Sequence, residues 1–297
     1  MVPTLRTRRG EHLTRKSFPT SLTGTLLIGL MLTTVIGCAQ PAQPQQQTQP
    51  PQAPKTLTVF AAASLTESFT EIGKQFEADN PGVKVTFNFA GSQQLRAQLE
   101  QGARADVFAS ANAKEMTTAI ISDSLVLSGT QHTFVTNRLA VILPRSNPGK
   151  ITSLADLARP GLKLDFADPS VPVGQYTLDM LAKMSQDATF GATFKDNVVA
   201  NVVSREDNVK SVVAKVQLGE ADAGVVYTTD ITPGAAKDLA TRDIPDKFNV
   251  IATYPIAPLK NAPEPKLASQ FVDWVLSSKG QQVLATYGFI PAASAKP

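Results

Sequence analysis

The sequence has very few of the residues from which disulfides, metal clusters and histidine-dependent catalytic sites are built. It contains one cysteine and two histidines among 297 residues. A single cysteine excludes an intrachain disulfide, and Cys38 cannot belong to a cysteine metal cluster. His132 is the only histidine beyond the first 37 residues, so it has no second histidine or cysteine with which to share a metal. The sequence also lacks a P-loop and a G-x-S-x-G motif, the signatures of nucleotide hydrolysis and of many serine hydrolases.

Long apolar runs are also scarce. The run from Leu26 to Gly37 is shorter than the roughly 20 residues needed to span a bilayer. It follows a basic segment and ends in Val-Ile-Gly-Cys, which resembles a bacterial lipobox. We therefore expect residues 1–37 to be a lipoprotein signal peptide and Cys38 to be the lipidated first residue of the mature chain. The alternative is a plain signal peptide with an incidental cysteine.

An excess of charge of one sign is absent once this segment is set aside. Residues 1–37 hold five of the 28 basic residues and one of the 25 acidic ones, so the remainder has a net charge of −1. The precursor's basic character is thus no argument for a nucleic-acid partner, and we expect none. The expected location is periplasmic or otherwise extracytoplasmic, with the membrane contacted through the lipid anchor only.

Residues 39–54 are almost only alanine, glutamine, proline and threonine, and they have nothing to bury. With Cys38 they predict an extended tether over residues 38–54. From Lys55 onward the composition is that of a globular protein large enough for two modest lobes or one large domain.

The globular part alternates short apolar strands with amphipathic helices, which predicts an α/β fold with mainly parallel sheets. Strands are expected at Leu57–Ala61, Val83–Phe89, Val107–Ala109, Leu139–Leu143, Leu164–Ala167, Ala223–Tyr227, Val250–Ala252 and Ile256–Leu259. Helices or helical turns are expected at Leu65–Ala78, Gln93–Gln101, Leu154–Leu157, Gly174–Lys183, Glu206–Leu218, Lys266–Ser277 and Gly280–Tyr287.

Four junctions are similar, because in each a strand is followed at once by small or polar residues and then by a helix. They are the segments 61–67, 89–95, 171–176 and 204–209. Ligands of open α/β sheets lie at the carboxyl ends of strands, and helix N-termini there offer unpaired N–H groups and partial positive charge. Such junctions can bind an anion without arginine or lysine. In the alternative interpretation Ser64 only caps a helix, in an S-x-x-E capping box with Glu67, and Tyr227 is an ordinary core tyrosine.

The segments VFAAASLTESF, FAGSQQLRAQLEQGARADVFASA, DPSVPVGQYT and GVVYTTD together resemble the molybdate-binding proteins of bacterial ABC importers, in register from about Lys55 to Pro291. The resemblance implies a two-lobed type II periplasmic-binding-protein fold with the anion between the lobes. It implies lobes of residues 55–138 plus 255–297 and of residues 139–254. It also implies a molybdate or tungstate ligand, an ABC permease as partner, a monomer, no cofactor and no direct metal ligand. The implied anion contacts are the hydroxyls of Ser64, Ser92 and Tyr227 and the backbone N–H groups of Val173 and Val209. Gly91 stands where a serine can stand in the family.

Two alternatives stay open. The ligand could be another tetrahedral oxyanion such as sulfate or phosphate, although phosphate often needs an acceptor for its proton and no matched position supplies a carboxylate. The chain could instead be a secreted serine hydrolase with Ser64 as nucleophile, for which His132 would have to be the base. Arg96, Arg104 and Asp106 follow the second junction, where solvation or an Arg–Asp pair is the expected role. Asp168 and Pro169 predict a turn rather than a metal site.

Overall fold

The computed structural model describes residues 54–292. The predicted signal peptide, Cys38 and almost all of the predicted tether lie outside these residues. Within the described range, no helix is both long enough and apolar enough to cross a membrane.

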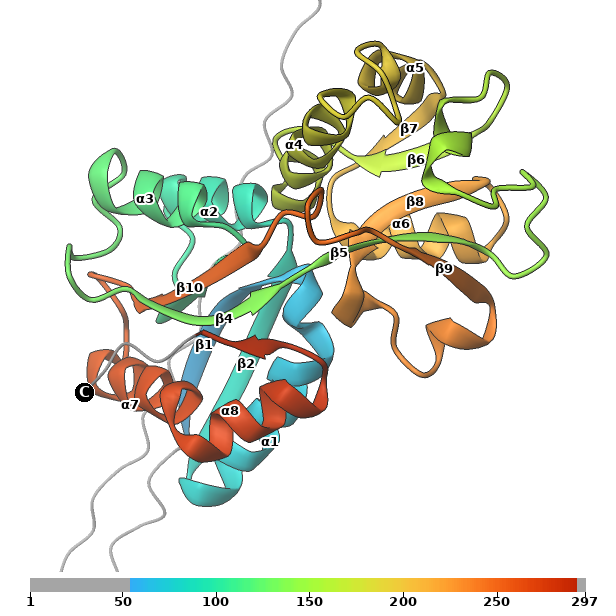
Figure 1. Cartoon of the computed structure of the whole chain (residues 1–297). Coiled ribbons are helices and arrows are strands. Elements are labelled where there is room, and N and C mark those ends of the chain that lie inside the picture. The colour runs from blue at the N-terminus through green and yellow to red at the C-terminus, as the bar shows by residue number, and fades with distance from the viewer. Residues whose placement is uncertain (1–53, 293–297) are drawn as a thin grey trace, which may run out of the picture. The chain divides into compact units, whose positions relative to one another are not determined.

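The described chain forms two sheets, each with its own helices (Figure 1). The first sheet has the order β11-β4-β10-β3-β1-β2. Its strands are β1 (Lys55–Ala62), β2 (Val83–Ala90), β3 (Val107–Ala109), β4 (His132–Asn137), β10 (Ala252–Pro258) and β11 (Ile290–Pro291). The helices that pack with it are α1 (Thr66–Asp79), α2 (Ser92–Glu100), α3 (Ala113–Ile121), α7 (Pro265–Leu276) and α8 (Ser278–Thr286). We call this sheet and its helices the first lobe.

The second sheet has the order β7-β6-β8-β5-β9. Its strands are β5 (Leu139–Pro144), β6 (Leu164–Ala167), β7 (Val202–Glu206), β8 (Ala223–Tyr227) and β9 (Leu239–Asp243). Its helices are α4 (Pro172–Ser185), α5 (Phe194–Ala200) and α6 (Val209–Gln217), and with the sheet they form the second lobe. Short 3₁₀ helices are η1 (Ala63–Leu65), η2 (Leu154–Ala158), η3 (Thr228–Asp230) and η4 (Ala235–Lys237).

Both sheets are mixed. In the first, β1 is parallel to β2 and β3, whereas β10 is antiparallel to β3 and β4. In the second, β6 is parallel to β7 and β8, whereas β5 is antiparallel to β8 and β9. The predicted α/β class is confirmed, but the sheets are less parallel than expected. The reason is that β5 and β10 are antiparallel to their neighbours. β5 is the first strand after the chain crosses into the second lobe, and β10 is the first strand after it returns to the first lobe.

Alternating side chains of β1 supply cores on both faces of the first sheet. Val59 joins the cluster that includes Phe69 and Phe76 of α1, whereas Phe60 joins the cluster that includes Leu95 of α2. The predicted apolar face of α1 is buried. Gly73 belongs to that face, and a Cβ there would lie 2.7 Å from the Phe87 ring. A glycine at this position therefore lets α1 pack closely on β2.

β4, β7, β9, α3 and α5 have no counterpart among the predicted elements, and two predicted boundaries near the site differ from the structure. The two strands expected at 250–252 and 256–259 are one strand, β10, whose register shifts at Tyr254/Pro255. Pro255 interrupts the sequence pattern, but the bulge accommodates its missing N–H. The helix expected from Glu206 begins at Val209, because Glu206 ends β7 and the Asn208 side chain caps α6 by accepting from Ser211 N–H.

Candidate anion site

The predicted site residues come together in one pocket, although they come from five separate segments. A small pocket is lined by residues of both lobes. Its lining residues are Ala62, Ala63, Ser64, Ala90, Gly91, Ser92, Ala111, Val171, Pro172, Val173, Asn208, Val209 and Tyr227. No residue in this set carries a formal charge, so the described pocket offers hydrogen-bond donors rather than ion pairs.

Ser64 lies in η1, immediately after β1, and it is buried. Its Oγ lies 3.0 Å from the hydroxyl oxygen of Tyr254. Asn137 Nδ2 lies 3.4 Å from the same tyrosine oxygen, and an amide NH₂ can only donate. Tyr254 can therefore accept from Asn137 and donate to Ser64, which leaves the Ser64 proton for the pocket.

The predicted capping box between Ser64 and Glu67 is wrong. η1 precedes α1, the residue before α1 is Leu65, and no side chain caps this helix end. The Glu67 carboxylate instead accepts two hydrogen bonds from Lys210 of the second lobe. The Ser64 hydroxyl thus contacts the Tyr254 hydroxyl and does not cap a helix.

Ser92 is the first residue of α2 and is also buried. Its Oγ accepts a hydrogen bond of 3.0 Å from the Ala111 N–H. As with Ser64, the serine oxygen can accept from a neighbouring donor, so the hydroxyl proton remains for another acceptor. At the adjacent Gly91 a Cβ would lie 2.4 Å from the Asp207 carbonyl oxygen. The missing side chain at Gly91 therefore permits the close approach of the two lobes beside Ser92.

Three helices begin at the pocket: α2, α4 and α6. First-turn N–H groups have no partner within their own helix and carry partial positive charge. Val173 is the second residue of α4 and Val209 the first residue of α6, so both N–H groups belong to this set. A Cβ at the next residue, Gly174, would lie 2.1 Å from the Asp168 carbonyl oxygen, so glycine is needed to seat the start of α4 on its loop.

Tyr227, the last residue of β8, is 1% exposed. Its hydroxyl is buried and has no hydrogen-bond partner among the described residues. A buried hydroxyl without a partner is costly, so this group is a candidate donor for a polar ligand. Burial, with the neighbouring Tyr254, raises the pKa of Tyr227 well above its usual value, so the hydroxyl stays a neutral donor. Tyr227 is a core tyrosine by burial and a pocket residue by position.

The other polar residues considered from sequence lie apart from the pocket lining. Arg96 forms ion pairs with Glu115, Glu100 and Asp123. The Asp106 carboxylate accepts from the Thr58 and Glu264 N–H groups, and Arg104 lines a different cavity. Asp168 accepts from Ser170, as the predicted turn requires. His132 is exposed at the start of β4 and is not among the residues that line the pocket with Ser64.

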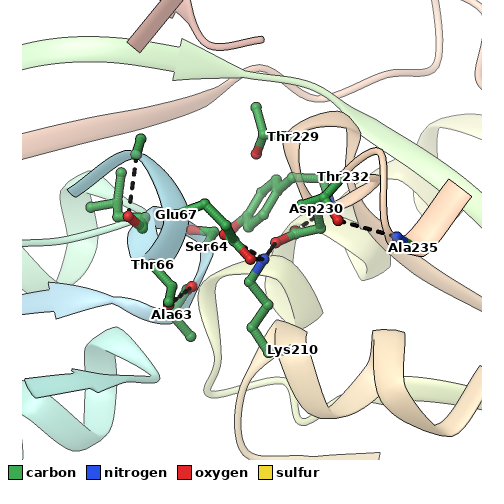
Figure 2. A network of polar contacts seen from close by, with 12 residues as sticks. Ala63, Ser64, Thr66, Glu67, Lys210, Thr229, Asp230, Thr232 and Ala235 are labelled. Atoms are coloured by element: carbon green, nitrogen blue, oxygen red, sulfur yellow. Dashed lines mark hydrogen bonds and ion pairs between the residues drawn. The ribbon is translucent and has the colours of Figure 1, made fainter. Parts of the chain in front are cut away.

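A charged network that the sequence did not reveal lies next to the pocket (Figure 2). Lys210 Nζ contacts Glu67 of α1 at 2.8 Å and Asp230 of η3 at 3.2 Å. Burial raises the pKa of Asp230, against the opposing effect of Lys210. Burial alone would lower the pKa of Lys210, but the two carboxylates outweigh it and raise that pKa. Lys210 is therefore a cation fully engaged by acids and is not among the residues that line the pocket.

Two α/β lobes, with a pocket of neutral donors where strand ends and helix N-termini of both meet, define a two-lobed solute-binding protein. Residues 57–290 match the family model described as bacterial extracellular solute-binding protein, and the chain belongs to that family.

Named relatives agree with this assignment. The molybdate-binding protein ModA of Mycobacterium bovis is 40% identical over 264 residues, which cover 89% of this chain and 95% of the relative. A putative ABC transporter substrate-binding lipoprotein, YvgL of Bacillus subtilis, is 30% identical over 86% of this chain and 92% of its own length. The sulfate-binding protein SubI of Mycobacterium tuberculosis has a similar structure, with a TM-score of 0.72, 19% identity and coverage of 81% of this chain and 88% of that one. At that identity the likeness to SubI shows the fold alone.

Proposed function

We propose that this protein captures molybdate or tungstate outside the cytoplasm and delivers it to an ABC importer. The observation that carries the proposal is the gathering of five residues, from five segments, around one uncharged pocket: Ser64, Ser92, Val173, Val209 and Tyr227. The 40% identity to a relative named as a molybdate-binding protein supports the choice of anion.

The proposed contacts are three hydroxyls and two backbone N–H groups. All five are donors, and a fully deprotonated dianion has only acceptors, so every contact is favourable. Helix N-termini of α2, α4 and α6 add partial positive charge without a counter-ion that must be desolvated. The site therefore suits a tetrahedral dianion that carries no proton.

Sulfate has the same shape and charge, and it is the main alternative ligand. A fixed ring of donors distinguishes the anions by size, because the larger molybdate and tungstate reach donors that sulfate cannot reach together. Calorimetric titration of the protein from Lys55 onward with molybdate, tungstate, sulfate and phosphate tests the proposal. We expect molybdate and tungstate to bind at least about tenfold more tightly than sulfate. Equal or tighter binding of sulfate would reject the assignment.

An enzymatic role for Ser64 is the second alternative. A nucleophilic serine needs an adjacent base, and the neighbour of Ser64 Oγ is the hydroxyl of Tyr254. Burial raises the pKa of Tyr254 well above its usual value, so its hydroxyl stays protonated and cannot take up the serine proton. We therefore propose that the protein is not an enzyme, and we expect no turnover of ester substrates.

We further propose that Cys38 carries the lipid anchor and that the protein acts as a monomer at the membrane surface. The relative described as a lipoprotein supports the anchor. Cys38→Ser should release the protein into the soluble extracytoplasmic fraction with unchanged anion affinity, as measured by fractionation and titration. Persistence on membranes would mean that the apolar segment 26–36 is retained as the anchor.

A further inference from the structure

The start of α6 is held by the first lobe from two sides. On one side Lys210 Nζ donates to both carboxylate oxygens of Glu67 in α1, at 2.9 and 2.8 Å (Figure 2). On the other side Gln93 Nε2 donates to the Asp207 carbonyl at 2.9 Å, and Gln94 Nε2 donates to the Asp207 carboxylate at 3.0 Å. The segment 207–210 therefore lies between two sets of contacts that cross from lobe to lobe.

These crossing contacts come from the same helix starts as the proposed hydroxyl donors. Glu67 follows Ser64 by three residues, and Gln93 and Gln94 follow Ser92 directly. The segment that they hold contains Val209, which is the first residue of α6 and lines the pocket. A separation of the lobes that breaks the crossing contacts thus also moves Val209 away from the two serines.

Lys210 is positioned by its own lobe before it reaches across. Its Nζ lies 3.2 Å from Asp230 Oδ1, and the Asp230 side chain is fully buried. The other carboxylate oxygen of Asp230 accepts from the Tyr227 N–H at 3.1 Å. Asp230 thereby connects Lys210 to the end of β8, where Tyr227 lies. Because Asp230 already restrains the Lys210 side chain, Lys210 loses less conformational entropy when it pairs with Glu67.

We propose that Lys210 and Glu67 are a positioning pair that sets how long the bound anion stays in the pocket. The inference rests on the proposed function, since the residence time is that of the oxyanion. Neither side chain is among the residues that line the pocket, so the pair acts through the placement of Val209 and the serines. We call it the interlobe pair.

The pair should act on dissociation more than on association. An anion that leaves a closed pocket must first wait for the lobes to separate, and separation breaks the interlobe pair. The Glu67 and Lys210 side chains are 38% and 26% exposed, so the pair is partly screened by solvent. An effect of about two- to fivefold on the dissociation rate is the range expected for one partly exposed ion pair.

Glu67→Gln is the preferred variant. It removes the carboxylate that pairs with Lys210 across the lobes, and it leaves Lys210 paired with the buried Asp230 of its own lobe. Glu264→Gln is the matched control: Glu264 pairs with Lys55 at 3.1 Å, is 33% exposed, and both residues belong to the first lobe. Stopped-flow displacement of bound molybdate measures dissociation, calorimetry measures affinity, and thermal unfolding without ligand measures stability. Lys210→Met is a second variant. It should raise the dissociation rate at least as much, and it also leaves the buried Asp230 carboxylate without its charged partner.

Glu67→Gln should raise the dissociation rate about two- to fivefold and remove most of its dependence on salt, with ligand-free stability matching Glu264→Gln. Glu264→Gln should leave the dissociation rate unchanged. A Glu67→Gln rate equal to that of the unaltered protein, in a protein that binds molybdate, overturns the interlobe pair and leaves the proposed function standing. Failure of the unaltered protein to bind any of the four oxyanions overturns both.

Discussion

At the scale of single residues, each pocket serine has a hydrogen-bond donor behind its oxygen. Tyr254 is placed to donate to Ser64, and the Ala111 N–H donates to Ser92. A hydroxyl whose oxygen already accepts a bond is oriented with its proton toward the open side. This arrangement can orient hydroxyls that would otherwise rotate freely, as the proposed anion site requires.

The first prediction concerns these hydroxyls. Ser64→Ala, Ser92→Ala and Tyr227→Phe should each weaken molybdate binding by about ten- to a hundredfold, because each removes one hydrogen bond to a charged acceptor, worth about 1.5–3 kcal/mol. Isothermal titration calorimetry measures the effect. Arg96→Ala and Arg104→Ala are the controls, and they should change affinity much less, since neither arginine lines the pocket. Binding that survives the serine changes but not an arginine change would place the anion elsewhere.

A second residue-scale prediction concerns Asp165 in β6, which is buried and whose carboxylate oxygens have no hydrogen-bond partner among the described residues. Burial, together with the nearby Glu206, raises the pKa of Asp165 to about 7. A raised carboxyl pKa means that the folded state binds the proton more tightly than the unfolded chain does. The stability that this proton provides is complete below about pH 4 and is lost as the pH rises through about 7.

Asp165→Asn should therefore stabilise the protein more at pH 8 than at pH 4, by about 1–4 kcal/mol, because the amide never ionises. Chemical denaturation of both proteins across this range measures the difference. A difference that does not change with pH would show that Asp165 is not protonated in the folded state.

At the scale of elements, the starts of α4 and α6 are not equivalent. Pro172 already occupies the first position of α4, so the Val173 N–H is the first one that this helix can offer. α6 begins with Val209 after Asn208, whose φ of −158° and ψ of 166° are extended. The residue before a proline prefers an extended conformation, and proline is favoured at the first position of a helix. The backbone at Asn208 and Val209 is therefore compatible with a proline at position 209.

The third prediction uses this difference. Val209→Pro should keep α6 intact but remove the N–H at the pocket, and it should weaken molybdate binding by about ten- to a hundredfold. Val209→Ala keeps the N–H, so it should bind nearly as well as the unaltered protein even if the smaller side chain lowers stability. Circular dichroism verifies the helix, and calorimetry reports affinity. Equal affinity of the proline and alanine variants would exclude a contact from this N–H.

The strand-to-helix junctions could be predicted from sequence because short apolar runs, helix starts and small residues are local signals. The boundary of α6 could not be predicted as easily, since Glu206 favours a helix and yet ends β7. The predicted elements contain no counterpart of α3, although Asn112 and Glu115 form a capping signal and Asn112 does cap this helix by accepting from the Glu115 N–H. Glu67 and Lys210 lie 143 residues apart, so no local pattern could show their contact.

At the scale of the whole molecule, a pocket lined by both lobes implies that the lobes separate to admit the anion and close upon it. The chain passes between lobes where β4 ends at Asn137 and β5 begins at Leu139, and again before β10 begins at Ala252. We propose these two crossings as the hinge. Binding then shifts the population toward the closed form.

The fourth prediction follows from closure. Small-angle X-ray scattering of the protein from Lys55 onward should show a smaller radius of gyration with saturating molybdate than without it. Ser92→Ala at the same molybdate concentration should show a smaller decrease in the radius of gyration, because a smaller fraction of the variant is bound to molybdate. An unchanged radius at saturation would count against hinge closure.

The most direct test of the central claim is a crystal structure of the protein with molybdate, with the metal located by its anomalous scattering. We expect one strong peak in the pocket between η1 and the starts of α2, α4 and α6. Its oxygens should lie within hydrogen-bonding distance of the Ser64, Ser92 and Tyr227 hydroxyls and of the Val173 and Val209 N–H groups. A fully occupied anion held instead by arginine or lysine side chains, with this pocket filled by water, would show that the proposed site is wrong.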